Sequence, residues 1–220
     1  MNRTEIIARI EAEKLIAIVR GIKKDYLIDM AEAMFAGGVR LLEVTYSADG
    51  TVSDEETADG IRTLKSHFGN RMGIGAGTVL SERQVELTAA AGGEFIISPD
   101  TSPDVIRKTR DLGLVSIPGA LTPTEVQTAH RAGADFVKLF PITSLGVPYV
   151  KAVRAPLSHV KLLAVGGVDE HNMADYLAAG ICGFGIGSNL VNKALIESGD
   201  FAGVTALAEK FMRALKEAQK

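Results

Sequence analysis

A single lysine, Lys138, interrupts an otherwise apolar stretch that runs from Asp135 to Pro141. Burying an ammonium group costs free energy unless the group is paired, neutralised or used in chemistry. A lysine near a strand end can also extend its charged tip to the surface, and taken alone this explanation is equally good. A desolvated lysine that has lost its proton is a nucleophile for ketones, so imine formation is the chemistry that this stretch suggests.

Two other charged residues have the same inward parity as Lys138 along their predicted strands. Side chains in a parallel barrel alternate between the interior and the helical shell. Arg20 follows the apolar strand 15–19, and Glu43 lies within the strand 39–45. A buried ion-paired cluster is a poor stabiliser, so three inward charges at the C-terminal ends of strands favour a functional site. The next two strands bring two further candidates to this mouth, Thr78 and Pro99.

Glycines close the last two predicted strands. Gly166 and Gly167 follow the seventh strand, and Gly187 with Ser188 follows the eighth. Glycines let backbone N–H groups converge, and the N-terminus of a following helix adds a favourable dipole for an anion. Phosphate sites of (β/α)8 enzymes often lie in these loops. The two loops predict a site for a phosphate group or a carboxylate, bound by backbone amides and the Ser188 hydroxyl.

The elements that position these residues alternate strictly between strand and helix. An amphipathic helix is expected over residues 3–13, followed by eight short apolar strands, each with a helical stretch behind it. Ser81, Thr122 and Asp169 are the expected N-caps of three of these helices. The predicted strands are 15–19, 39–45, 72–76, 94–98, 114–117, 135–141, 160–165 and 182–186. The pattern fits an α/β fold of the (β/α)8 (TIM) barrel type with an extra N-terminal helix, although a doubly wound sheet shows the same alternation.

Bulk composition limits the remaining function classes. The 220 residues are 46% hydrophobic and 23% charged without a linker, which predicts a single domain over 1–220. A net charge of −3 without a basic cluster argues against a nucleic-acid partner. The single cysteine, Cys182, suits a reducing cytoplasm, and no apolar run reaches the roughly 20 residues that span a bilayer. The four histidines show no ligand spacing, so we expect a cytoplasmic protein with no metal or cofactor and no membrane partner.

A set of short motifs runs in order along the chain: IVR at 18–20, GGV at 37–39, LEVT at 42–45, GAGTV at 75–79, FIISP at 95–99, PG at 118–119, LTPTE at 121–125, VKLFP at 137–141, VGGV at 165–168 and GS at 187–188. This ordered set resembles the 2-keto-3-deoxy-6-phosphogluconate (KDPG) aldolases, many of which also act as 4-hydroxy-2-oxoglutarate (KHG) aldolases. The resemblance covers nearly the whole chain, and the set is specific although its single pieces are weak.

The resemblance implies a class I aldolase on a (β/α)8 fold, usually a homotrimer, that needs no cofactor. It implies a 2-keto-4-hydroxy acid substrate that yields pyruvate with glyceraldehyde 3-phosphate from KDPG, or with glyoxylate from KHG. Lys138 matches the Schiff-base lysine and Glu43 the general acid/base. The matches to the substrate pocket are Arg20, Thr78, Pro99 and Phe140, and those to the phosphate loops are Gly166, Gly167, Gly187 and Ser188.

One position departs from the family pattern. Well-studied KDPG aldolases carry an arginine two residues after the threonine of the Glu-Val-Thr motif, where it helps to hold the substrate carboxylate. This chain has Ser47 there, and the following acidic loop, residues 48–56, is several residues longer. Some relatives, including the aldolases for the C4 epimer 2-dehydro-3-deoxy-6-phosphogalactonate (KDPGal), also lack that arginine. KDPG, KDPGal and KHG therefore all stay open as substrates.

Two other functions stay open on the residues themselves. The first is a sugar-phosphate isomerase or epimerase, with Glu43 as the base and Lys138 as an electrostatic partner. The second is a binding protein for sugar-acid phosphates that keeps the pocket without turnover. Release of pyruvate and a trapped imine would distinguish an aldolase from both.

Overall fold

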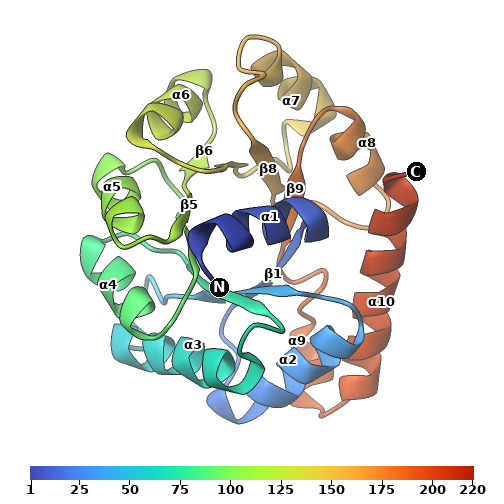
Figure 1. Cartoon of the computed structure of the whole chain (residues 1–220). Helices are drawn as coiled ribbons and strands as arrows, with labels where there is room; N and C mark the ends of the chain where they lie inside the picture. The colour runs from blue at the N-terminus through green and yellow to red at the C-terminus, as the bar shows by residue number, and fades with distance from the viewer.

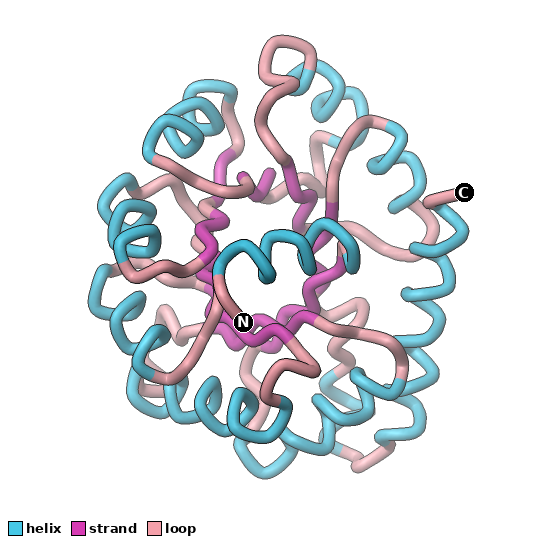
Figure 2. Tube along the Cα trace, viewed as in Figure 1, coloured by secondary structure: helices cyan, strands magenta, loops and turns pink.

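The computed structural model describes residues 1–220 and shows a ring of parallel strands enclosed by helices (Figures 1 and 2). The strands are β1 (Leu15–Val19), β2 (Leu41–Thr45), β3 (Gly73–Gly77), β4 (Phe95–Ile97), β5 (Val115–Ile117), β6 (Gly119–Ala120), β7 (Val137–Leu139), β8 (Leu162–Val165) and β9 (Gly183–Ile186). Their order in the sheet is β5-β4-β3-β2-β1-β9-β8-β7-β6. The predicted (β/α)8 barrel is therefore confirmed, and the doubly wound alternative is wrong.

The helices cover the outside of this ring, except for the first. They are α1 (Arg3–Glu13), α2 (Leu27–Ala36), α3 (Asp54–Phe68), α4 (Glu82–Ala90), α5 (Pro103–Asp111), α6 (Pro123–Ala132), α7 (Gly146–Arg154), α8 (Met173–Ala178), α9 (Lys193–Glu197) and α10 (Phe201–Ala218), with a 3-10 turn η1 (Lys24–Tyr26) before α2. Predicted N-caps form as expected at α4 and α6, where Ser81 and Thr122 accept hydrogen bonds from backbone N–H groups. No helix is both long enough and apolar enough to cross a membrane.

β5 and β6 are two parts of one wall of the barrel, separated by Pro118. Proline has no N–H to donate, so the ladder is interrupted there. Three backbone hydrogen bonds nevertheless join this wall to the β7 segment, from Phe136 N to Ser116 O at 3.3 Å, Lys138 N to Pro118 O at 2.9 Å and Phe140 N to Ala120 O at 3.0 Å. β5 and β6 stand at the two ends of the strand order, and these hydrogen bonds join both of them to the β7 segment, so the ring is closed.

The apolar core divides into two clusters, as the inward and outward parity of the strands requires. The larger one lies between the outer faces of the strands and the surrounding helices. The smaller one joins two isoleucines of α1 to residues inside the barrel, and its members are Ile6, Ile10, Ile16, Leu41, Phe95, Ile97, Val115, Ile117, Phe136 and Leu163. Helix α1 thus covers the N-terminal end of the barrel, where it crosses in front of the strands in Figures 1 and 2.

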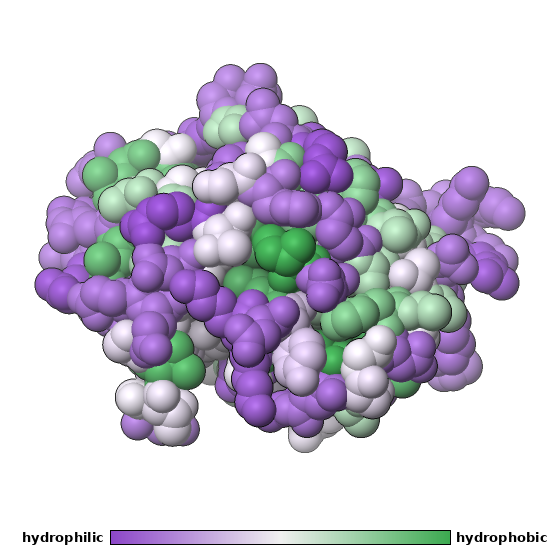
Figure 3. Space-filling model, turned by 90° about the horizontal axis from the view of Figure 1, so that it is seen from below, coloured by the Kyte–Doolittle hydropathy of each residue, from purple (hydrophilic) through white to green (hydrophobic).

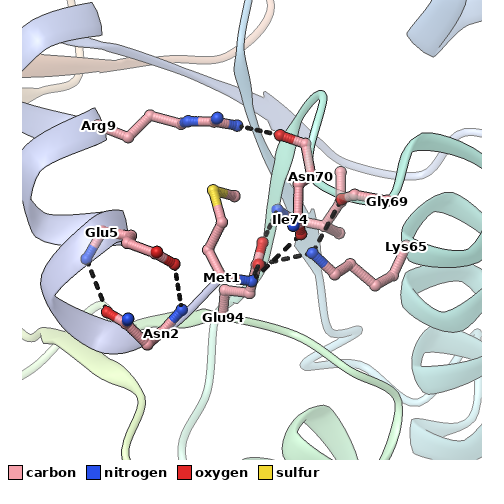
Figure 4. A network of polar contacts seen from close by, with 9 residues as sticks. All are labelled: Met1, Asn2, Glu5, Arg9, Lys65, Gly69, Asn70, Ile74 and Glu94. Atoms are coloured by element: carbon pink, nitrogen blue, oxygen red, sulfur yellow. Dashed lines mark hydrogen bonds and ion pairs between the residues drawn. The ribbon is translucent and has the colours of Figure 1, made fainter.

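A polar network fastens the start of the chain to this end of the barrel (Figure 4). The carboxylate of Glu94, which is 6% exposed, receives the amino group of Met1 and the ammonium of Lys65, both at 2.6 Å. The backbone N–H of Ile74 donates to its other oxygen at 3.2 Å. The buried charge of Glu94 is therefore fully partnered, so this network serves the stability of the barrel end under α1 and leaves no group free for chemistry there. The inward charges of the opposite end are paired less completely.

Candidate active site

Lys138 and Glu43 lie inside the barrel. Only 7% of Lys138 and 2% of Glu43 is exposed. Phe136 belongs to the interior cluster, so Lys138, two residues further along the same strand direction, points to the same side. Glu43 stands in the same relation to the interior residue Leu41. The sequence parity therefore predicts the placement of both side chains correctly.

Burial drives both groups toward their neutral forms. It raises the pKa of the Glu43 carboxyl, against the opposing effects of the charges on Lys138 and Arg20 and of a hydrogen bond from Thr45. Burial also lowers the pKa of the Lys138 amine, and the charge on Arg20 lowers it further while Glu43 opposes. The pair thus combines an amine that readily loses its proton with a carboxyl that readily holds one.

One oxygen of Glu43 has no partner within the protein. Oε1 accepts a long hydrogen bond of 3.5 Å from the Thr45 hydroxyl. Oε2 is buried, and no protein group donates a hydrogen bond to it. A buried oxygen without a partner is costly, and such atoms concentrate at sites of chemistry. Oε2 is accordingly the atom of this carboxyl that can exchange a proton with a bound molecule.

Gly77, the last residue of β3, makes room for this carboxyl. A Cβ built on Gly77 would lie 1.5 Å from Glu43 Oε1, far inside contact distance. Gly77 pairs with Thr45 across the β2–β3 ladder, which brings it beside the inward face of β2. The carboxyl thus occupies the volume that any other side chain at position 77 would fill. The Gly-Ala-Gly pattern within a buried strand is the only sequence signal of this role.

Arg20 and Thr78 meet at the rim of the mouth. The guanidinium of the exposed Arg20 donates a hydrogen bond of 3.4 Å to the Thr78 hydroxyl. Thr78 has φ 55°, a left-handed conformation that is rare for a β-branched residue and costs on the order of 1–3 kcal/mol. The fold therefore holds this hydroxyl at the mouth against a local conformational cost. Pro99 and Phe140, both half-buried, complete the rim at the ends of β4 and β7.

A cavity of about 570 Å³ opens beside this rim, under the long loop that follows β2. Arg20, Thr45 and Thr78 line it, whereas Lys138 and Glu43 do not. Its other walls include Lys23 and Lys24, the loop residues 46–49, 51 and 52, and the first half of α3. The cavity thus adjoins the reactive pair through three residues of the rim, and two further ammonium groups stand at its edge.

Ser47, the residue in place of the family arginine, is bound within this loop. Its hydroxyl donates to Asp49 Oδ1, and Thr51 donates to the same oxygen through its N–H at 3.1 Å and its hydroxyl at 2.8 Å. These hydrogen bonds lower the pKa of Asp49 to about 2. Ser47 therefore stabilises the loop, and Arg20 is the cation that the structure brings to Thr78.

The glycine loops after β8 and β9 lie side by side at the mouth. Gly166 and Gly167 have φ of 92° and 72°, which glycine adopts readily. The Asn189 side chain, beside Gly187 and Ser188, donates to Val168 O at 3.1 Å and joins the two loops. A Cβ on Gly167 would lie 2.9 Å from the Thr143 hydroxyl, so this hydroxyl also faces the loop. Thr143 is a candidate that the sequence reading missed, because it follows the lysine strand and carries no motif.

The helix dipole expected behind these loops is absent. The prediction that Asp169 caps the helix after Gly167 is wrong, because α8 begins only at Met173 with Asn172 as its N-cap residue. Asp169 instead accepts N–H hydrogen bonds from His171 and Asn172 within the preceding turn. The α9 helix is only five residues long and begins beyond Ser188. The hydrogen-bond donors that these loops offer to an anion are therefore backbone N–H groups and hydroxyls.

Known proteins share the sequence and the fold of this chain. The family model described as "Aldolase: KDPG and KHG aldolase" matches residues 6–207. The probable 2-dehydro-3-deoxy-6-phosphogalactonate aldolase of Rhizobium meliloti (strain 1021) is 41% identical over 177 residues, covering 80% of this chain and 81% of the relative.

Two solved structures extend this similarity to the fold. A native KDPGal structure aligns with a TM-score of 0.83 at 34% identity, covering 93% of this chain and 95% of its own. The KDPG aldolase of Legionella pneumophila, with pyruvate captured as a covalent carbinolamine, aligns with a TM-score of 0.83 at 27% identity, covering 92% and 96%. This chain therefore belongs to the KDPG and KHG aldolase family, as the resemblance of its motifs predicts.

Proposed function

We propose that this protein is a class I aldolase that cleaves a phosphorylated 2-keto-4-hydroxy acid through an imine on Lys138. The observation that carries the proposal is the buried amine of Lys138, which interacts electrostatically with the buried carboxyl of Glu43, at the end of the barrel left open by α1. Membership of an aldolase family favours a carbon–carbon lyase over the isomerase and the binding protein. No step of this chemistry requires a metal or an organic cofactor, because an iminium is itself an electron sink.

The residues suggest the following sequence of bond changes. The neutral amine of Lys138 attacks C2 of the keto acid, and the C2 oxygen leaves as water with one amine proton and one proton from Glu43. The ionised Glu43 then removes the C4 hydroxyl proton, the C3–C4 bond breaks, and its electron pair moves into the iminium to form an enamine. Glu43 returns the proton to C3, and water releases pyruvate and regenerates the amine.

The relatives favour KDPGal as the first substrate to test. The 41% identical relative is named as a probable KDPGal aldolase, and one of the matching structures is described as a native KDPGal structure. We propose that Arg20 and Thr78 bind the C1 carboxylate, because their contact lies at the rim and Ser47 is committed to the loop. Pro99 and Phe140 would line the pyruvate pocket, while Gly166, Gly167, Gly187 and Ser188 would bind the phosphate. KDPG and KDPGal would give the same products, pyruvate and glyceraldehyde 3-phosphate.

The deciding experiment combines turnover with trapping. Release of pyruvate is measured with lactate dehydrogenase and NADH for KDPG, KDPGal and KHG, and the intact mass is recorded after borohydride treatment with pyruvate. We expect turnover of at least one phosphorylated substrate and a reduced pyruvyl adduct on Lys138. A protein that bound these acids without turnover, or exchanged their protons without releasing pyruvate, would contradict the aldolase proposal.

We further propose that residues 1–220 act as one aldolase domain, in the cytoplasm, and assemble as a homotrimer. Val52, Leu80, Leu112 and Leu145 are large apolar side chains on the surface, and Figure 3 shows apolar patches between polar residues on the face seen from below. An assembly that covers such patches removes them from water. Sedimentation equilibrium would test the stoichiometry, and a concentration-independent monomer would contradict it.

Replacing Arg20 with glutamine is expected to move the acidic limb of the pH–rate profile to higher pH. The positive charge of Arg20 lowers the pKa of both Lys138 and Glu43, so its removal raises both. Because only the neutral amine attacks a ketone, a higher pKa of Lys138 delays the rise of activity as the pH increases. The measurement is kcat/KM from pH 5 to 9, with R213Q at an exposed position of α10 as the control. An unshifted profile would argue that Arg20 does not act on the pair.

Replacing Ser188 with alanine is expected to lower kcat/KM selectively for phosphorylated substrates. Loss of one hydrogen bond to a charged group would lower kcat/KM for KDPGal or KDPG by about 10-fold or more. KHG has no phosphate, so its kcat/KM serves as an internal control and should change by less than about twofold if Ser188 contacts only the phosphate. Equal losses of kcat/KM for the phosphorylated substrate and for KHG would show that Ser188 does not act through the phosphate.

A further inference from the structure

The aromatic ring of Phe140 faces the amine of Lys138. Phe140 follows Lys138 by two residues, so both side chains leave the β7 segment on the same side. The Lys138 Nζ lies 4.4 Å from the ring centroid, within the range of a cation–π contact. A Cβ built on Gly166 would be 3.7 Å from Phe140 Cδ2, which shows that the ring packs against the glycine loop after β8. The ring is thus held beside the nitrogen by two neighbouring strands.

The other groups around this nitrogen offer little stabilisation to a positive charge. Arg20 is itself positive and opposes a second cation. Glu43 is the only carboxyl among the groups that perturb the amine, and burial favours its protonated form. A ring face carries partial negative charge that does not depend on protonation, and its attraction for a cation grows when water is excluded. The contact therefore has the most value at a buried nitrogen such as this one.

We infer that Phe140 is a catalytic residue whose ring face stabilises the iminium on Lys138, and this inference rests on the proposed imine mechanism. In the step concerned, the bond from Nζ to C2 is complete, the C2–O bond breaks, and the oxygen leaves as water. The nitrogen keeps one proton and gains a positive charge that the neutral amine did not have. Because the ring attracts the charged state more than the neutral one, it favours dehydration to the iminium.

A role in packing alone makes a different prediction. If Phe140 only fills apolar space beside the substrate, its volume matters and the charge distribution of its ring does not. Phe140→Leu would change both properties and cannot separate the two roles. Fluorination withdraws charge from the ring face while it changes the volume of the side chain only slightly, so a graded fluorine series isolates the electrostatic contribution.

The experiment installs phenylalanines with one, two or three fluorines at position 140 of the full chain and follows pyruvate. Deuterium exchange at the pyruvate methyl group in D2O, measured by NMR, reports formation of the iminium and its enamine. We expect the logarithm of the exchange rate to fall steadily with each fluorine, to a total loss of about 10-fold. Thermal unfolding of each protein verifies that the fold is retained.

Phe136 provides the matched control. It is a phenylalanine of the same segment, 1% exposed, and its ring lies 5.5 Å from the Nζ of Lys161 and belongs to the interior apolar cluster. The same fluorine series at position 136 should leave the exchange rate unchanged. A flat series at position 140, or equal slopes at both positions, would overturn the role of Phe140 while the aldolase proposal stands. If the unsubstituted protein exchanged no protons of pyruvate, both the role of Phe140 and the aldolase proposal would be overturned.

Discussion

Replacing Lys138 with methionine is expected to abolish pyruvate trapping and to lower kcat/KM for aldol cleavage by at least about 10⁴-fold. Methionine retains most of the length and volume of the lysine stem, but it has no amine to form the imine. The residue is 7% exposed and lies where the smaller apolar cluster meets the mouth, so an apolar replacement suits its surroundings. Loss of the covalent intermediate, and not loss of the fold, should therefore cause the defect.

The same substitution is expected to preserve or raise stability. The pKa of Lys138 is lower in the folded protein than in the unfolded chain, so between these two values the unfolded state binds more protons. Folding is therefore opposed at pH values below the ordinary lysine pKa, and this cost falls as the pH rises through the window. K138M removes the cost at neutral pH. A midpoint of thermal unfolding equal to or above that of the normal protein would agree with this sign.

Lys161 offers a control for general effects of losing a lysine. Its side chain is 50% exposed, and it forms a surface ion pair with Glu11. K161M should retain turnover and the pyruvyl adduct, since exposed ion pairs contribute little to stability. An adduct that persisted in K138M, at any other lysine, would contradict the assignment of the nucleophile.

The sequence predicts the site as far as periodicity can determine it. The strands alternate with a period of two, and the apolar residues that flank Lys138 and Glu43 define which face meets the helices. That is enough to place both side chains inside the barrel and at its C-terminal end. The Pro and Ser/Thr signals at helix starts are equally local, which explains why the N-caps at Ser81 and Thr122 are predicted correctly.

Features that depend on backbone conformation or on empty volume escape this reasoning. Nothing in the residue type of Thr78 indicates a left-handed φ, which tertiary packing imposes. The glycine turn after β8 suggests a helix start, but the chain forms a separate turn around Asp169 before α8 begins. The cavity beside Arg20 depends on how the long loop folds over α3, and the hydrogen bonds of Asp49 that shape this loop carry no periodic signal.

Gly77 is the most informative of these omissions, because its contribution is the absence of a side chain. Gly77→Ala is expected to lower kcat by about 10²- to 10⁴-fold, the range lost when a general acid/base is misplaced. The added Cβ would lie 1.5 Å from Glu43 Oε1, so the carboxyl of Glu43 must leave the place that it occupies next to Gly77. Overpacking at this site would also cost about 1–3 kcal/mol of stability, so unfolding is measured alongside turnover.

A double-mutant cycle separates displacement of Glu43 from general damage. If Gly77 acts only by making room for the carboxyl, G77A should add little to the defect of E43Q, because the double variant has no acid/base left to misplace. Additive losses would indicate an independent effect on the barrel.

Gly60, in helix α3, supplies the comparison for an added methyl group, since a Cβ there would lie at an ordinary contact distance of 3.4 Å from the Leu27 side chain. G60A should keep turnover and gain about 0.4–1 kcal/mol of stability through the lower entropy of the unfolded chain. The contrast between G77A and G60A then measures how far the activity of Glu43 depends on the space that Gly77 leaves for its carboxyl.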